Sequence, residues 1–140
     1  REYLYIGLSE RQTELNIHFD MEIIQWSSHP PVSGNQGKVA LQRGPFVYCL
    51  EEEDNSKYLH LNFLTDQSIT EKSVEDPILG NIKILETVGE KEIINTEWID
   101  HLYRKHTRKE VEPTPLTFIP YYTWANRSIG EMQVWINKRE

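Results

Sequence analysis

The chain has 140 residues, 38% of them hydrophobic and 11% aromatic, and its formal net charge is -7. A chain of this length can bury enough surface to fold as one domain without a metal or disulfide staple, and its single cysteine excludes an intrachain disulfide. The acidic balance disfavours nucleic-acid binding, which needs clustered cations. The basic run at 104–109 is followed closely by Glu110 and Glu112, which indicates a solvated loop. We therefore expect no nucleic-acid partner.

Two sequence signals bear on membranes and compartment. No apolar run approaches the roughly twenty residues that a membrane-spanning helix needs. No signal-peptide pattern precedes the first strand-like run at Tyr3–Ile6. We expect a cytoplasmic protein with no membrane partner.

The first third of the chain alternates with period two. Leu15, Ile17 and Phe19 alternate with polar residues, which predicts a strand with one dry face, and 23–26 is a second short strand. Turn residues predict a loop over 27–35. The apolar run 38–50 is interrupted by a glycine and a proline at 44–45, so we expect two strand segments that meet at a bend there.

The rest of the chain shows further short strands. Residues 51–56 are predicted to be a polar turn, and 58–63 a strand whose inward residues are Leu59, Leu61 and Phe63. Ile82 and Ile84 share one face of the next strand. The stretch 95–114 fits either a helical turn or a short strand. Two last strands are expected at 116–119, ending at Pro120, and at 132–136.

No convincing helix of three turns occurs anywhere in this pattern. Short strands that recur between turn residues are typical of an antiparallel β-sandwich. The expected fold class is therefore all-β, a jelly-roll-like antiparallel sandwich with little or no helix.

Candidate polar sites each have a simpler explanation. The acidic run 51–54 lacks the spacing of a calcium loop and is better explained as a solvated turn. His101 and His106 lie five residues apart on an expected loop, a spacing that means little for a metal. Cys49 lies in an apolar run and is expected to be a buried small hydrophobe. Carboxylates are numerous, but no pair stands out as a glycosidase-type pair.

Aromatic residues form the other candidate site. Tyr122 and Trp124 fall on one side of an alternating pattern and Tyr121 on the other. Aromatic faces stack on sugar rings, so Tyr122 and Trp124 are candidates for carbohydrate contact. The alternative is packing within the core or between domains.

Two long motifs resemble the C-terminal region of glycoside hydrolase family 127, which β-L-arabinofuranosidases typify. The first is GKVALQRGPFVYCLE at 37–51, and the second is LTFIPYYTWANR at 116–127. A weaker match, PILGN, lies between them at 77–81. The resemblance spans nearly the whole chain.

The resemblance implies that catalysis lies elsewhere. It implies a parent enzyme with an (α/α)6 barrel followed by β-sandwich domains, which is the arrangement in family members. Their cysteine nucleophile, their glutamate and a zinc ion are attributed to the barrel. None of that motif occurs here, so the resemblance assigns no catalytic, cofactor-binding or metal-binding residue to this chain. Zinc is implied only for the catalytic domain.

These observations leave three functions open. The first is a non-catalytic accessory sandwich, formed by residues 1–140 as a C-terminal part of a larger enzyme, that supports the barrel and takes part in dimerisation. Residues 1–36 would then include strands shared with a preceding sandwich. The second is a carbohydrate-binding module that uses Tyr122 and Trp124. The third is a free-standing sandwich that binds other proteins through an exposed edge strand.

Overall fold

Strands dominate the computed structural model, which describes residues 3–7 and 14–139. The strands are β1 (Ile23–Ser27), β2 (Lys38–Arg43), β3 (Phe46–Glu51), β4 (Asn62–Leu64), β5 (Thr70–Asp76), β6 (Gly80–Glu92), β7 (Val111–Pro120), β8 (Met132–Gln133) and β9 (Ile136–Lys138). The helical elements are a single turn, α1 (Glu52–Asn55), and 3-10 turns at Ser33–Asn35, Leu59–Leu61, Thr96–Trp98 and Tyr121–Thr123. The expected all-β fold with little helix is confirmed.

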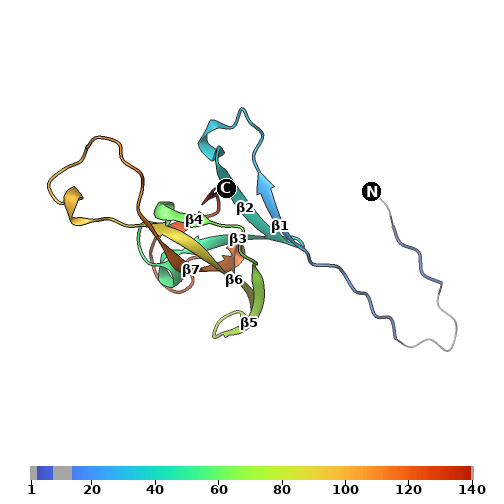
Figure 1. The fold of residues 1–140 in the computed structure, drawn as a ribbon. Coiled ribbons are helices and arrows are strands. Elements are labelled where there is room, and N and C mark those ends of the chain that lie inside the picture. The colour runs from blue at the N-terminus through green and yellow to red at the C-terminus, as the bar shows by residue number, and fades with distance from the viewer. Residues whose placement is uncertain (1–2, 8–13, 140) are drawn as a thin grey trace.

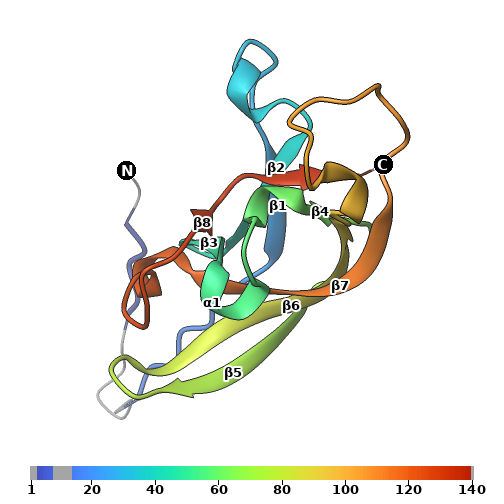
Figure 2. The same ribbon diagram turned by 90° about the vertical axis from the view of Figure 1, so that its left-hand side faces the viewer.

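The strands form one sheet that folds back on itself. Ladders connect β2, β9, β4, β6, β7 and β3 in that order, and β3 pairs with β2 again at Gln42↔Val47 and Arg43↔Phe46. In the part of the chain described, every pairing is antiparallel except β4 with β9. Strands β1, β5 and β8 extend this ring from β2, β6 and β3. The result is sandwich-like, and its strands curve around a common centre (Figure 2).

The inward faces of these strands form the main core. Its buried members are Val39, Leu41, Tyr48, Leu50, Leu59, Leu64, Leu85, Leu116, Phe118 and Ile136. Full burial of side chains of this size contributes about 1.5–3 kcal/mol each before the entropy of ordering is subtracted. A smaller cluster of Cys49, Ile82, Ile84 and Ile119 lies apart from it. The expectation that Ile82 and Ile84 share one face of their strand is confirmed, and that face is buried.

The longest ladder joins β6 to β7, from Leu85↔Phe118 to Glu92↔Val111. Strand β7 is longer than expected and includes Pro113 and Pro115. Prolines are tolerated here because β7 pairs only with β6 in this half, so alternate backbone nitrogens face away from the ladder.

The predicted bend between β2 and β3 is confirmed. Gly44 has φ 53°, a left-handed conformation that glycine adopts without penalty. A Cβ at this position would collide with the Met21 sulfur. Glycine is thus favoured mainly by the left-handed turn, because the flexible Met21 side chain could shift to make room for a Cβ.

Three local predictions are wrong. Residues 14–20 form no ladder, and Phe19 is 71% exposed, because none of the described strands lies beside them to pair with them; the segment runs away from the sheet (Figure 1). Residues 59–61 form a 3-10 turn after Tyr58, whose φ is 63°, so Asn62 and Leu64 are fully buried while Leu61 and Phe63 are only half-buried. The last strand is split into β8 and β9, which pair with different neighbours.

Candidate functional site

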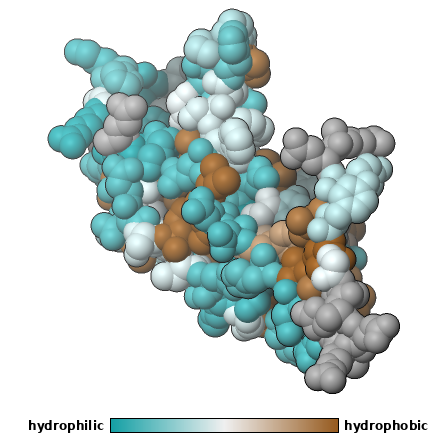
Figure 3. Space-filling model, turned by 90° about the vertical axis from the view of Figure 1, so that its right-hand side faces the viewer, coloured by the Kyte–Doolittle hydropathy of each residue, from teal (hydrophilic) through white to brown (hydrophobic). Residues whose placement is uncertain are grey.

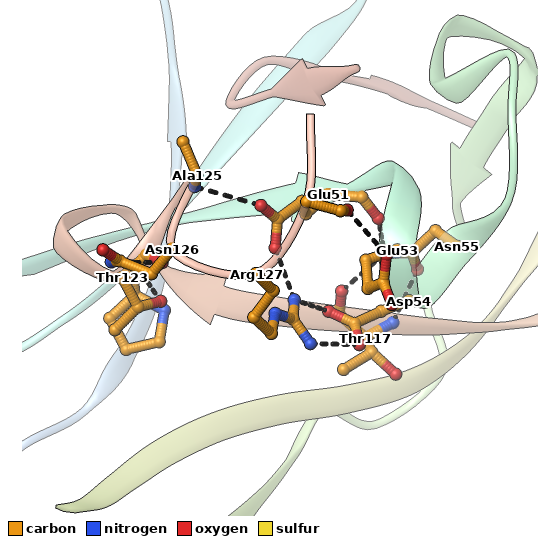
Figure 4. A network of polar contacts seen from close by, with 11 residues as sticks. Glu51, Glu53, Asp54, Asn55, Thr117, Thr123, Ala125, Asn126 and Arg127 are labelled. Carbon is orange, nitrogen blue, oxygen red and sulfur yellow. Dashed lines mark hydrogen bonds and ion pairs between the residues drawn. The ribbon is translucent and has the colours of Figure 1, made fainter. Parts of the chain in front are cut away.

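The most elaborate polar cluster joins the end of β3 to the loop that follows β7 (Figure 4). Glu51 is 1% exposed, and its carboxylate accepts the Ala125 N–H at 3.1 Å and contacts the Arg127 guanidinium. Arg127 also donates to both carboxylate oxygens of Asp54, at 2.8 and 2.5 Å. One arginine therefore bridges two acidic side chains.

Helix α1 and the same loop are joined by further hydrogen bonds. Ser128 Oγ donates to Glu53 at 2.6 Å, and the backbone N–H of Glu131 donates to Glu52 at 3.0 Å. The buried Asn55 side chain accepts the Thr117 N–H and donates to the Thr117 carbonyl, both at 2.9 Å. The single turn of α1 thus ties β3, β7 and the loop together.

The acidic run at 51–54 is therefore more than the solvated turn that was expected. Glu51 and Asp54 share Arg127, which lies 76 residues from Glu51 along the chain. Hydrogen bonds from Arg127, first to Asp54 and then to Glu51, hold the pKa of its guanidinium above the usual range. A permanently charged guanidinium exchanges no proton at neutral pH, so this cluster is suited to hold a loop and not to acid–base chemistry.

Cys49 is fully buried beside this cluster. Burial, and to a smaller extent the nearby Glu51, raises the pKa of its thiol to about 12. The thiol is therefore protonated at neutral pH and is a poor nucleophile, because the thiolate is the reactive form. The prediction that Cys49 is a buried small hydrophobe is confirmed.

The aromatic candidates lie in the 3-10 turn after β7. Tyr121 stacks against Trp124, with ring centroids 6.1 Å apart, and Tyr122 packs against Phe46 at 5.5 Å. Tyr122 is 54% and Trp124 39% exposed. The predicted pairing of Tyr122 with Trp124 on one side is wrong, because the turn brings residues three apart together. Both side chains nevertheless remain accessible.

The histidines were the other candidates for a metal site. Among the described residues, no group of three or more His, Cys, Asp or Glu side chains is placed to hold a metal ion. His60 packs edge-on against Tyr58, with centroids 6.2 Å apart. In the same residues no helix is long and apolar enough to cross a membrane.

Several solved structures share this fold. A family 127 β-L-arabinofuranosidase from Geobacillus stearothermophilus T6 is 40% identical with a TM-score of 0.78, over 85% of this chain and 18% of that protein. A structure described as a glycoside hydrolase is 29% identical with a TM-score of 0.74, over 86% of this chain and 20% of that one. A family 127 β-arabinofuranosidase is 29% identical with a TM-score of 0.73, over 87% of this chain and 18% of that protein.

Sequence comparison gives the same relationship. The non-reducing end β-L-arabinofuranosidase of Bifidobacterium longum subsp. longum is 28% identical over 138 residues, which are 95% of this chain. The chain spans about a fifth of the length of that relative (21%). Residues 23–137 match the model of the glycoside hydrolase family 127 C-terminal domain. The chain therefore belongs to the family of C-terminal domains of glycoside hydrolase family 127 enzymes.

Proposed function

We propose that this chain is a non-catalytic accessory domain that supports the catalytic part of a family 127 enzyme. The proposal rests on the environment of two side chains of types that can act in catalysis, the Glu51 carboxylate and the Cys49 thiol. Glu51 is committed to Arg127 and to a backbone N–H, and the Cys49 thiol is buried and protonated. Neither group is available to attack a sugar or to transfer a proton.

The exposed aromatic residues support contact with another domain. Phe46, Tyr121, Tyr122 and Trp124 are each between 38% and 54% exposed, and they form two ring pairs, Phe46 with Tyr122 and Tyr121 with Trp124. Apolar residues are also exposed on the face that bears the N-terminal segment (Figure 3). Contiguous exposed apolar surface marks an interaction site. The partner we propose is the (α/α)6 barrel of the parent enzyme, which would hold any zinc, with dimerisation as a further role.

The segment 14–20 supports a second contact with the parent enzyme. It is extended, its apolar residues alternate, and it forms no ladder with the sheet described here. An unpaired strand with one apolar face gains most by joining the edge of another sheet. The proposed neighbour is a preceding sandwich, to which residues 14–20 would add a strand while β1 stays in this domain.

The test of the accessory role has two parts. The 140-residue chain is assayed with a p-nitrophenyl β-L-arabinofuranoside, and we expect no turnover above buffer; enzyme-like rates that disappear in Glu51→Gln or Cys49→Ala would overturn the proposal. Residues 23–137 of this chain are then put in place of the matching domain in the Geobacillus relative. The chimera is expected to keep the activity of that enzyme, whereas an enzyme with no C-terminal domain loses thermal stability.

One double substitution, made in two proteins, tests the aromatic contact. Tyr122→Ser with Trp124→Ser is introduced into the chimera and into the isolated chain. If the rings pack between domains, the melting temperature falls in the chimera only. An equal fall in both proteins would show that the rings serve the fold of this domain alone.

The second candidate function is carbohydrate binding, favoured by the exposure of Tyr122 and Trp124. Titration of the chain with arabino-oligosaccharides should then quench tryptophan fluorescence saturably, and Trp124→Phe should remove most of that signal. No saturable change up to millimolar sugar would leave packing as the role of these rings.

A further inference from the structure

A cleft opens at the end of the molecule away from the Glu51–Arg127 cluster. It forms where the β1–β2 connection, β4, β9 and the residues just before β7 converge, and its volume is about 730 Å3. Pockets that bind small molecules typically measure about 300–1,000 Å3. Its walls include Ser28, Lys38, Phe63, Arg108, Lys109 and Lys138. This is room for a ligand about the size of a disaccharide.

The charge of this cleft is opposite to that of the whole chain. Lys38, Arg108, Lys109, Lys138 and Arg139 line it, and no aspartate or glutamate among the described residues does, although the chain carries a net charge of -7. Three of the cations reach carboxylates outside the lining: Lys109 reaches Glu92, Lys138 reaches Asp66, and Arg139 reaches Glu90. In each pair at least one side chain is more than a third exposed to solvent, and solvent-screened pairs contribute about 0–1 kcal/mol each, so they oppose ligand binding weakly.

The remaining two cations lack a carboxylate partner among the residues that the structure describes. The Lys38 ammonium donates to the Gly34 carbonyl at 2.9 Å, which leaves its charge uncompensated. Arg108 makes no ion pair with a described carboxylate, and its side chain lines the same cleft. A ligand with two anionic groups would compensate both charges.

The cleft also has an aromatic residue in its wall. Phe63 lines it, and the Lys109 ammonium lies over one face of the Phe63 ring, with 5.5 Å between the nitrogen and the ring centroid. The ring adds apolar surface beside the cationic groups.

We propose that this cleft binds a small anionic ligand that carries carboxylate or phosphate groups. Lys38 and Arg108 supply the charge, and Phe63 supplies apolar surface. An acidic sugar and a phosphate compound share this chemistry. The proposal does not depend on the accessory role in a family 127 enzyme, since it concerns binding to this chain alone.

The test compares three probes on the 140-residue chain by calorimetry and amide NMR at low salt. Digalacturonate represents an acidic sugar, pyrophosphate a phosphate source, and galactobiose an uncharged sugar of similar size. At least one anion should bind saturably, shift the amides of Gly37, Lys38 and Val111, and weaken as sodium chloride is added. Preference for digalacturonate supports the sugar source, and preference for pyrophosphate the phosphate source. Equal binding of galactobiose, or no saturable binding of either anion, overturns the proposal.

Matched variants locate the site. Lys38→Met with Arg108→Gln should weaken anion binding at least about tenfold, since each removes a charge-assisted contact. Lys57→Gln with Lys72→Gln removes the same charge from residues outside the cleft and should change the affinity less than about twofold, as expected for screened surface charges. Equal weakening by the two double variants would show non-specific attraction and overturn the site.

Discussion

Two loops of this domain are held very differently. The projecting loop, residues 93–110, joins β6 to β7 and extends from the sheet (Figure 1). The pinned loop, residues 121–131, joins β7 to β8 and lies against α1. Leu102 and Tyr103 in the projecting loop are 89% and 91% exposed. Arg127 in the pinned loop reaches the buried Glu51.

The contrast shows what orders a polar loop. The projecting loop contains an arginine over the Trp98 ring and a backbone hydrogen bond at its base, from Ile93 to Glu110. The pinned loop has a fully buried carboxylate as its anchor. A buried charge must be paired, so the position of Glu51 fixes the position of Arg127 much more strictly than any surface contact would.

The largest effect is expected from Arg127→Met. The variant leaves Glu51 buried with no opposite charge, and it should lose about 3 kcal/mol of unfolding free energy, at the low end of the cost of breaking a buried pair because Arg127 itself is 35% exposed. Lys105→Met in the projecting loop is the matched control and should cost less than about 0.5 kcal/mol. Urea unfolding measures both. Equal losses would mean that the two loops are not held differently.

The next effect is expected from Asn55→Ala. The variant removes both hydrogen bonds to Thr117 and the 3.0 Å bond to the Glu51 carbonyl. It should cost about 2 kcal/mol, because partly buried backbone groups lose their partners. The loop should also loosen, which faster amide hydrogen exchange at Ala125 would report. Unchanged exchange there would show that α1 does not hold the pinned loop.

The sequence predicted much of the sheet but not this contrast. Alternation and apolar runs are local signals, so β3, β6 and β7 and the bend at Gly44 could be located from them. The pairing of Glu51 with Arg127 has no local signal, because the two residues are 76 positions apart. An acidic run normally indicates solvent, and only the fold shows that its first member, Glu51, ends a buried strand.

Two further differences have the same physical origin. Residues 14–20 have the pattern of a strand, but a strand needs a partner, and none of the described strands pairs with them. Residues 58–63 alternate cleanly, yet the left-handed Tyr58 and the 3-10 turn that follows change which residues face inward. A sequence pattern identifies which segments can form strands, whereas tertiary contacts decide whether they pair and which residues face inward.

Acid should weaken the pinned loop through Glu131. The Leu59 N–H, which donates to this carboxylate at 2.8 Å, and to a smaller extent that of Tyr58 hold the pKa of Glu131 below its usual value of 4.5. A lowered pKa stabilises the fold above the unfolded-state value, and that contribution is lost as the pH falls through the folded-state value. Glu131→Gln should therefore be less stable than the parent chain at neutral pH and equal to it in strong acid. A constant difference in urea midpoint across this range would contradict the assignment.

The smallest effect on stability is expected in the projecting loop. Leu102→Ser with Tyr103→Ser removes two nearly fully exposed apolar side chains and should change the unfolding free energy by less than about 0.5 kcal/mol.

Trypsin offers a second measurement, because both loops contain arginine. Loosely held backbone is cut first, so cleavage after Lys105 or Arg108 should precede cleavage after Arg127 in the parent chain and in this variant. In Arg127→Lys, which keeps a trypsin site but loses the two-pronged contact with Asp54, cleavage of the pinned loop should accelerate while cleavage of the projecting loop does not. If both sites accelerate together, the loops open as one unit, and the buried pair is then an anchor for the whole domain and not for one loop.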